Sequence, residues 1–128
     1  MAFQKSVAVR NAELDQIETT IGVSAVLKLF SGAEPANCAA ADPTGLLATI
    51  NLPSDWMSNA AAGVKAKLGT WSGAASAGGT IASWRIYASD GTTTGLQGNT
   101  TDMTFDNTNV ASGQIVTVNT YQITAGNA

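Results

Sequence analysis

A helical hydrophobic period occurs once in this chain, within the first 22 residues. From Val23 onward, short runs of alternating apolar and polar residues take over, and Gly, Pro, Asn and Asp separate them. Parallel strands need crossover connections that are usually helices, and one helix cannot supply several crossovers. We therefore expect an all-β fold, namely a β-sandwich or jelly-roll-like domain of about eight short strands preceded by one N-terminal helix.

The 128 residues are enough for one hydrophobic core and too few for two. We divide the chain into an N-terminal helical arm, residues 1–22, and a β-sandwich domain, residues 23–128. The pair Asp90-Gly91 between two strand patterns predicts a tight hairpin, and the Ala-rich residues 31–44 predict a long loop. The expected strands are 25–30, 46–52, 64–71, 80–88, 93–97, 103–105, 115–118 and 121–124.

The N-terminal segment has the features of a helix with defined ends. Ser6 can cap its start, and Gly22 stands where a terminating glycine is expected. Its apolar residues follow steps of four and three, the spacing of a short coiled-coil seam that Arg10 interrupts. This seam could pack on the chain's own sheet or against another subunit. Its apolar members are the candidate subunit or partner contacts: Phe3, Val7, Leu14, Ile17 and Ile21.

The β region contains its own aromatic and aliphatic core residues, so we expect the helix to serve association more than folding. Trp84 and Ile86 face the core in the pattern of strand 80–88. The residues that alternate with them point to the opposite face of the sheet: Ser83, Arg85 and Tyr87. The expected core residues are Trp71, Trp84, Ile86, Phe105, Val116, Val118 and Ile123.

Histidine is absent, which removes the usual general base at neutral pH and the commonest metal ligand. Cys38, the single cysteine, has no partner for an intramolecular disulfide and is expected to be a reduced, packed thiol. No Lys or Arg follows Arg85, which argues against a phosphate-binding surface in that part of the chain. We expect no enzyme activity, no catalytic, metal-binding or cofactor-binding residues, and no nucleic-acid or membrane partner.

Two sets of polar residues invite a chemical interpretation. Asp102, Thr104 and Asp106 lie at i, i+2 and i+4, so one strand face would project all three towards a calcium ion or a sugar. Two carboxylates on a straight strand supply too few oxygens for calcium, so we prefer a solvated strand face. Lys65 and Lys67 also share a face and could pair with acidic residues of a neighbour. We prefer exposed lysines that protect an edge strand.

Two classes of function remain. Low charge with many Thr and Asn residues suits both a structural subunit that binds protein surfaces and a carbohydrate-binding sandwich. The apolar seam of the N-terminal helix favours the structural subunit. Trp56 and Trp71 exposed side by side would favour the carbohydrate-binding module, whereas a buried Trp56 needs an acceptor for its indole N–H.

Four stretches resemble small bacteriophage and prophage virion proteins. They are MAFQKSVAVRNAELDQIETTIG, LKLFSGAEPANCAAADPTGLLATINLPSDWM, WRIYASDGTTTGLQG and DMTFDNTNVASGQIVTVNTYQITAGNA. They span nearly the whole chain and follow the same succession of strands, loops and hairpin. The resemblance implies a β-rich, non-enzymatic component of the phage head or neck.

On this resemblance we expect a bacteriophage virion structural protein, a capsid decoration (cement) protein that stabilises the head by binding neighbouring major capsid subunits. It would form a homo-oligomer and bind the major capsid protein or another virion protein. Its location would be the virion, after synthesis in the host cytoplasm. A neck, collar or tail accessory protein is the alternative, and a carbohydrate-binding module is the third possibility.

Overall fold

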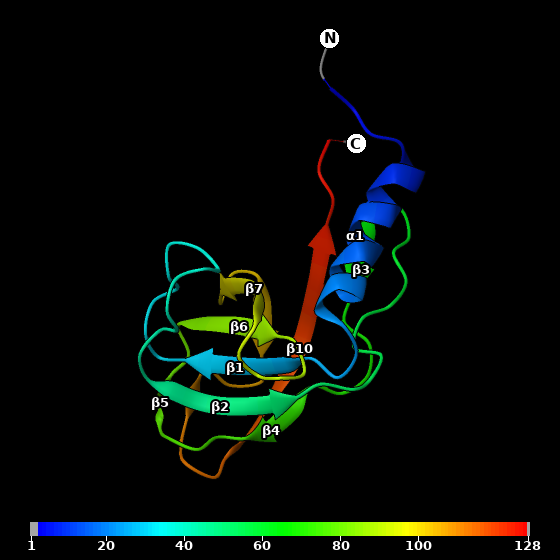
Figure 1. Ribbon diagram of the computed structural model, residues 1–128. Coiled ribbons are helices and arrows are strands. Elements are labelled where there is room, and N and C mark those ends of the chain that lie inside the picture. Colours follow the sequence, from blue (N-terminus) through cyan, green and yellow to red (C-terminus); the bar gives the residue numbers. More distant parts are fainter. Residues whose placement is uncertain (1–2, 128) are drawn as a thin grey trace.

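The computed structural model describes residues 3–127. Within them, one N-terminal helix precedes ten strands in antiparallel sheets, which confirms the expected all-β domain with one preceding helix (Figure 1). The elements are α1 (Val7–Ile21), β1 (Val26–Phe30), β2 (Leu46–Asn51), β3 (Val64–Ala66), β4 (Ser72–Ala74), β5 (Gly79–Thr80), β6 (Ser83–Tyr87), β7 (Thr94–Asn99), β8 (Met103–Phe105), β9 (Asn109–Val110) and β10 (Ile115–Thr124).

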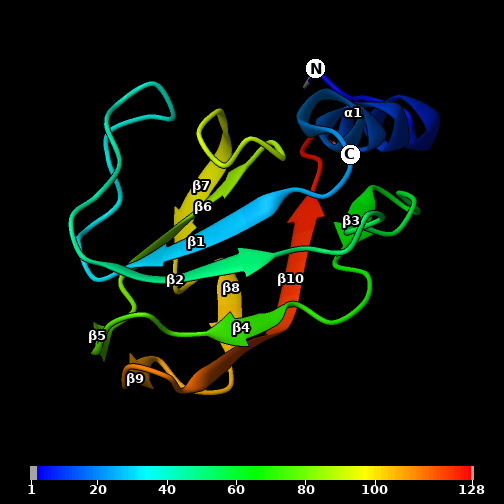
Figure 2. The same ribbon diagram turned by 60° about the horizontal axis from the view of Figure 1, so that its bottom comes forward.

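One sheet has the strand order β2-β1-β6-β7, and the central strands β1 and β6 are buried. The second sheet is organised by β10, which pairs with β3, β4 and β8, while β5 and β9 form a separate two-stranded ribbon (Figure 2). A register shift between Val118 and Thr120 marks an irregularity where β10 pairs with β8. The ten residues of β10 therefore serve several short partner strands.

Side chains from both sheets form one buried core. The rings of Trp71 and Tyr121 lie 5.8 Å apart, and those of Trp84 and Tyr121 lie 5.1 Å apart at a steep angle. The predicted core residues Phe105 and Ile123 are only half-buried and pack against this core. The other predicted core residues are confirmed as buried: Trp71, Trp84, Ile86, Val116 and Val118.

Local signals at the helix and the hairpin are confirmed. The Ser6 hydroxyl accepts a hydrogen bond from Val9 N–H at 3.2 Å, and Gly22 ends the helix with φ of 94°. In the hairpin between β6 and β7, Gly91 has φ of 71° and the Asp90 carboxylate accepts backbone N–H groups of the turn. The hydrogen bonds from Thr93 and then from the turn N–H groups lower the pKa of Asp90 to about 2.

Four of the expected strands differ clearly from the strands of the structure. The expected strand 64–71 ends at Ala66, because Lys67 and Leu68 turn to meet the segment at Met57, and Gly69 then adopts φ of 75°. The expected strand 80–88 divides into β5 and β6, because the two residues between them bond to different segments. The expected strands 115–118 and 121–124 are one continuous strand, and the short strands β4 and β9 were not expected.

Candidate functional site

The helix α1 lies against β3 along one edge of the domain (Figure 1). A stripe of polar side chains on α1 makes this contact, although the sequence directs attention to the apolar seam. The stripe, Asn11, Asp15 and Glu18, stands at i, i+4 and i+7 on one helix face. Its three contacts are Gly63 N–H to Asn11 Oδ1 (2.9 Å), Ala60 N–H to Asp15 Oδ1 (2.9 Å) and Met57 N–H to Glu18 Oε2 (3.2 Å).

Lys65 completes this contact from β3. Its side chain is 1% exposed, so the prediction of an exposed, edge-protecting Lys65 is wrong. Its ammonium lies 2.9 Å from a carboxylate oxygen of Asp15 and 2.9 Å from one of Glu18. It also donates to the Ser58 carbonyl at 2.8 Å. The neighbouring Lys67 is half-buried and donates to a backbone carbonyl.

The neighbouring carboxylates determine the direction in which the pKa of Lys65 shifts. Burial alone would lower the pKa of Lys65, but the hydrogen bonds to Asp15 and Glu18 outweigh it and raise that pKa above its usual value. The hydrogen bond from Lys65, followed by that from Ala60 N–H, lowers the pKa of Asp15. The helix is thus held to β3 by one buried ammonium and by the carboxylates of Asp15 and Glu18.

The C-terminal end of α1 covers a buried tryptophan. Trp56 is fully buried, and its indole N–H donates to the Gly22 carbonyl at 2.9 Å, which supplies the acceptor that a buried Trp56 requires. Leu14 is 2% exposed, so the chain itself buries it. The prediction that Leu14 contacts a partner is therefore wrong, because its side chain is not available to another protein in this fold.

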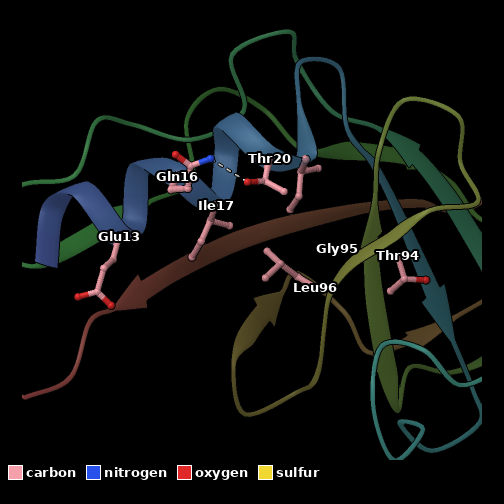
Figure 3. Close-up of a pocket in the computed structure, with 8 residues that line it drawn as sticks. Glu13, Gln16, Ile17, Thr20, Thr94, Gly95 and Leu96 are labelled. Atoms are coloured by element: carbon pink, nitrogen blue, oxygen red, sulfur yellow. Dashed lines mark hydrogen bonds between the residues drawn. The ribbon is translucent and has the colours of Figure 1, made fainter.

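The other seam residues remain open to solvent to different degrees. Phe3 is 75% exposed and Val7 is 48% exposed. Ile17 and Ile21 are half-buried and line a groove of about 360 Å³ between α1 and β7, opposite Leu96 (Figure 3). Phe3 and Val7 are therefore the predicted contact residues that stay accessible, whereas Ile21 packs against the domain's own core.

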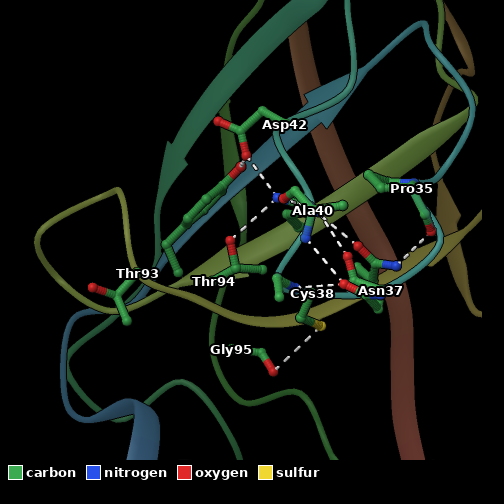
Figure 4. A network of polar contacts seen from close by, with 12 residues as sticks. Pro35, Asn37, Cys38, Ala40, Asp42, Thr93, Thr94 and Gly95 are labelled. Atoms are coloured by element: carbon green, nitrogen blue, oxygen red, sulfur yellow. Dashed lines mark hydrogen bonds and ion pairs between the residues drawn. The ribbon is translucent and has the colours of Figure 1, made fainter.

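A second polar cluster lies on the outer face of the first sheet. Residues 31–45, hereafter the strap, fold over this face and bury Arg85 and Tyr87 (Figure 4). The sequence correctly places Arg85 and Tyr87 opposite the core, but it does not show that a loop covers them. All five guanidinium N–H groups of Arg85 are used, in bonds to Gln97, Asp42, Thr94 and the carbonyls of Asn37 and Ala40.

The Asp42 carboxylate joins the strap to both buried side chains. The same oxygen, Oδ1, lies 2.9 Å from Arg85 Nη1 and accepts the Tyr87 hydroxyl at 2.6 Å. Burial, followed by this hydrogen bond to Asp42, raises the pKa of Tyr87. Cys38 lies on the strap as an exposed thiol, with its sulfur 4.0 Å from the Gly95 carbonyl, so the prediction of a packed thiol is wrong. The strap is an ordered cover held mainly by Arg85.

The polar residues considered for calcium or sugar are each engaged by neighbouring groups. Asp102 accepts the Asn99 N–H at 3.0 Å, Asp106 accepts the Thr117 N–H at 3.1 Å, and Thr104 bonds to a hydroxyl of β10. Among residues 3–127, no three His, Cys, Asp or Glu side chains gather closely enough to hold a metal ion.

The aromatic residues that a sugar-binding platform would need lie inside the protein. Trp56 and Trp71 are fully buried, with their ring centroids 6.1 Å apart, and Trp84 is buried as well. The side-by-side exposure that would favour a carbohydrate-binding module is not found. This observation removes the feature on which that interpretation depended.

Sequence reasoning missed the residues that dock the helix and the strap. Asn11, Asp15 and Glu18 form a regular polar stripe, and their i, i+4, i+7 spacing is visible in the sequence. Asp42 and its partner Arg85 are 43 residues apart, so no local pattern relates them.

No family model, curated protein or solved structure matches the chain. In the part of the chain that the structure describes, no helix has the length and apolar character needed to cross a bilayer.

Proposed function

We propose that this chain is a non-enzymatic structural protein of a bacteriophage virion, a capsid decoration protein that binds neighbouring major capsid subunits as a homo-oligomer. The observation that carries the proposal is the way α1 is docked. Polar side chains hold it on the domain, while Phe3 and Val7 remain on the surface at 75% and 48% exposure. Exposed apolar side chains on an ordered helix end favour a role in protein association.

The distribution of charge supports an association by shape, apolar contact and hydrogen bonds. Only 12% of the residues are charged, and most of these side chains are engaged within the chain. Few charges are therefore left for long-range attraction to a partner. The resemblance of the four quoted stretches to phage virion proteins is our reason for proposing a phage particle as the assembly that the protein joins.

The test is attachment to phage heads that lack this protein. Purified protein is mixed with such heads, and the bound fraction is measured by co-sedimentation at about 50 mM and about 500 mM NaCl. Salt at the higher concentration screens exposed charges beyond roughly 4 to 5 Å, so an apolar and hydrogen-bonded contact should retain most of its binding. The variant Val7→Asp should reduce the bound fraction, whereas Thr101→Asp, on a turn of the β region, should leave it unchanged.

Two results would overturn the proposal. Heads that bind no protein at either salt concentration would exclude capsid decoration. Binding that is lost steeply with salt would exclude the apolar contact. If gold-labelled protein is found on the neck or tail of the intact particle, the alternative of a neck or tail accessory protein replaces decoration of the head.

A further inference from the structure

Two charged side chains stand apart from all the others. The chain has six Lys and Arg residues and nine Asp and Glu residues, and all of them lie within the described part. Thirteen have a carboxylate, ammonium, guanidinium, carbonyl, amide, hydroxyl or aromatic ring as partner. The side chains of Arg10 and Asp55 have no hydrogen-bond or ion-pair partner among residues 3–127. The fold thus leaves one cation and one anion without a partner in the described part of the chain.

The Arg10 side chain lacks an acceptor within the described residues and is not freely solvated. Its Nε atom is buried and has no acceptor among the described residues, and its guanidinium lies over Gly63, where any side chain at that position would collide with it. Buried N–H groups almost always have an acceptor. The two deeply buried cations, Lys65 and Arg85, are surrounded by acceptors. Arg10 is only half-buried, so an external carboxylate could supply the acceptor that the fold does not.

Apolar surface accompanies Arg10 at the N-terminal end of α1. Val7 and Arg10 are three residues apart on one helix face, and Phe3 precedes the N-cap at the same end. Phe3, Val7 and Val9 are large apolar side chains left exposed there, and Val7 shares the face of Arg10. This end of the helix therefore presents a cation together with exposed apolar side chains.

The opposite end of α1 has the complementary composition. Asp55 is exposed and lines a pocket of about 350 Å³ together with Val23 and the last turn of the helix. Val23 is 71% exposed, which is close to the exposure of Phe3. This end therefore presents an anion next to an apolar side chain and a pocket.

We propose that the occupant of both ends is a second copy of this chain, in a dimer with twofold symmetry. Arg10 of one copy pairs with Asp55 of the other, and Phe3 packs on Val23 at the same contact. The two ends of α1 are separated by about 21 Å, from the rise of 1.5 Å per residue. An antiparallel arrangement of two helices places each end opposite its complement. Twofold symmetry then forms every contact twice.

The inference deepens the proposed function, because it names a second copy as one of the partners of a homo-oligomeric virion protein. Dimerisation is measured on the isolated full chain and needs no phage head. A dimer that does not bind heads would overturn the capsid role alone. A monomer that binds heads would overturn this inference and the homo-oligomeric state, and it would leave the role in capsid decoration standing.

The experiment is a charge swap followed by sedimentation velocity. Wild type should sediment as a dimer at concentrations up to about 100 μM, the range in which a modest interface is populated. Arg10→Glu and Asp55→Arg should each raise the dissociation constant at least about tenfold, because each places like charges opposite one another. The double variant carrying both changes should recover the dimer. Glu34→Arg, a charge reversal on the strap, should leave dimerisation unchanged.

A further variant protects the test against a change in folding at Arg10. Phe3→Ser lies in the extended segment before the helix, so it should weaken the dimer without changing the far-UV spectrum or the cooperativity of thermal unfolding. A wild type that is monomeric over the whole range would overturn the inference. Single reversals that remain dimeric, or a folded double variant that remains monomeric, would overturn it as well.

Discussion

At the residue scale, the buried ammonium of Lys65 decides how the helix is attached. A lysine that is 1% exposed must have its charge compensated, and Asp15 and Glu18 of α1 are the only carboxylates that do so among the described residues. Removing one side of a buried charge cluster leaves the other side buried and unpaired, which is costly. The attachment of α1 is therefore an energetic requirement of β3 as well as of the helix.

The double variant Asp15→Ala with Glu18→Ala should lower the free energy of unfolding by about 3 to 5 kcal/mol, because it leaves Lys65 without a counter-charge. Urea denaturation with linear extrapolation measures the change. Glu13→Ala is the matched control on the same helix. It removes only the exposed ion pair with Lys5 and should cost less than about 1 kcal/mol.

The same cluster predicts a pH dependence with a defined sign. The pKa of Asp15 is lower in the folded chain than its usual 3.8, so Asp15 stabilises the fold above about pH 4 and that contribution is lost as the pH falls through the folded pKa. Wild type should lose more unfolding free energy than Asp15→Asn between about pH 5 and pH 2. Equal losses in both proteins, or equal costs for the double variant and Glu13→Ala, would contradict the role given to Lys65.

At the element scale, the strap shows how a loop becomes ordered without a helix or strand of its own. Arg85 donates hydrogen bonds to the carbonyls of Asn37 and Ala40. The Asp42 carboxylate accepts hydrogen bonds from Arg85 and from the Tyr87 hydroxyl. The side-chain amide of Gln97 donates a hydrogen bond to the Pro35 carbonyl at 2.8 Å. The outer face of β6 is consequently as buried as its core face.

Arg85→Met should release the strap while the sandwich stays folded. Hydrogen bonds to a charged group contribute about 1.5 to 3 kcal/mol each, so amides within residues 31–45 should exchange at least about tenfold faster in hydrogen-exchange mass spectrometry. Peptides from β10 should be unaffected. Lys28→Met is the control, since Lys28 lies on the same sheet face and contacts the Tyr87 ring. A strap that stays protected without Arg85 would show that other contacts hold it.

The elements also show which sequence signals are informative. Ser6, Gly22 and the Asp90-Gly91 pair act through neighbouring residues, so the helix ends and the hairpin could be predicted. The burial of Arg85 could not, because it depends on where a distant loop lies. The burial of Lys65 also depends on a contact 50 residues away in sequence, with Asp15.

The helix seam illustrates the same limit at the candidate site. Apolar spacing predicted a contact surface along α1, but it could not distinguish Leu14, which the domain buries, from Phe3, which it leaves exposed. The distinction depends on how far the helix extends past the sheets. Polar spacing at Asn11, Asp15 and Glu18 marked the docked face, although an apolar core normally makes such contacts.

At the scale of the whole molecule, the helix and the sandwich form one structure. Within the expected arm, α1 and Gly22 are tied to the domain by Lys65, by the Trp56 indole and by backbone N–H groups that donate to helix side chains. The contribution of the helix to folding is therefore larger than the apolar seam suggested. The association proposed for it rests on the apolar side chains that this docking leaves exposed, among them Phe3, Val7 and Val9.

Hydrogen exchange of the full-length protein, followed residue by residue by NMR, tests this account most directly. The amides of Met57, Ala60 and Gly63 donate to α1 side chains, so their protection depends on the docked helix. We predict that these amides and those of α1 open with about the same free energy as the core strands β6 and β10, as one cooperative unit. Fast exchange of α1 and of these three amides beside a protected sandwich would contradict the account and show α1 to be a free arm.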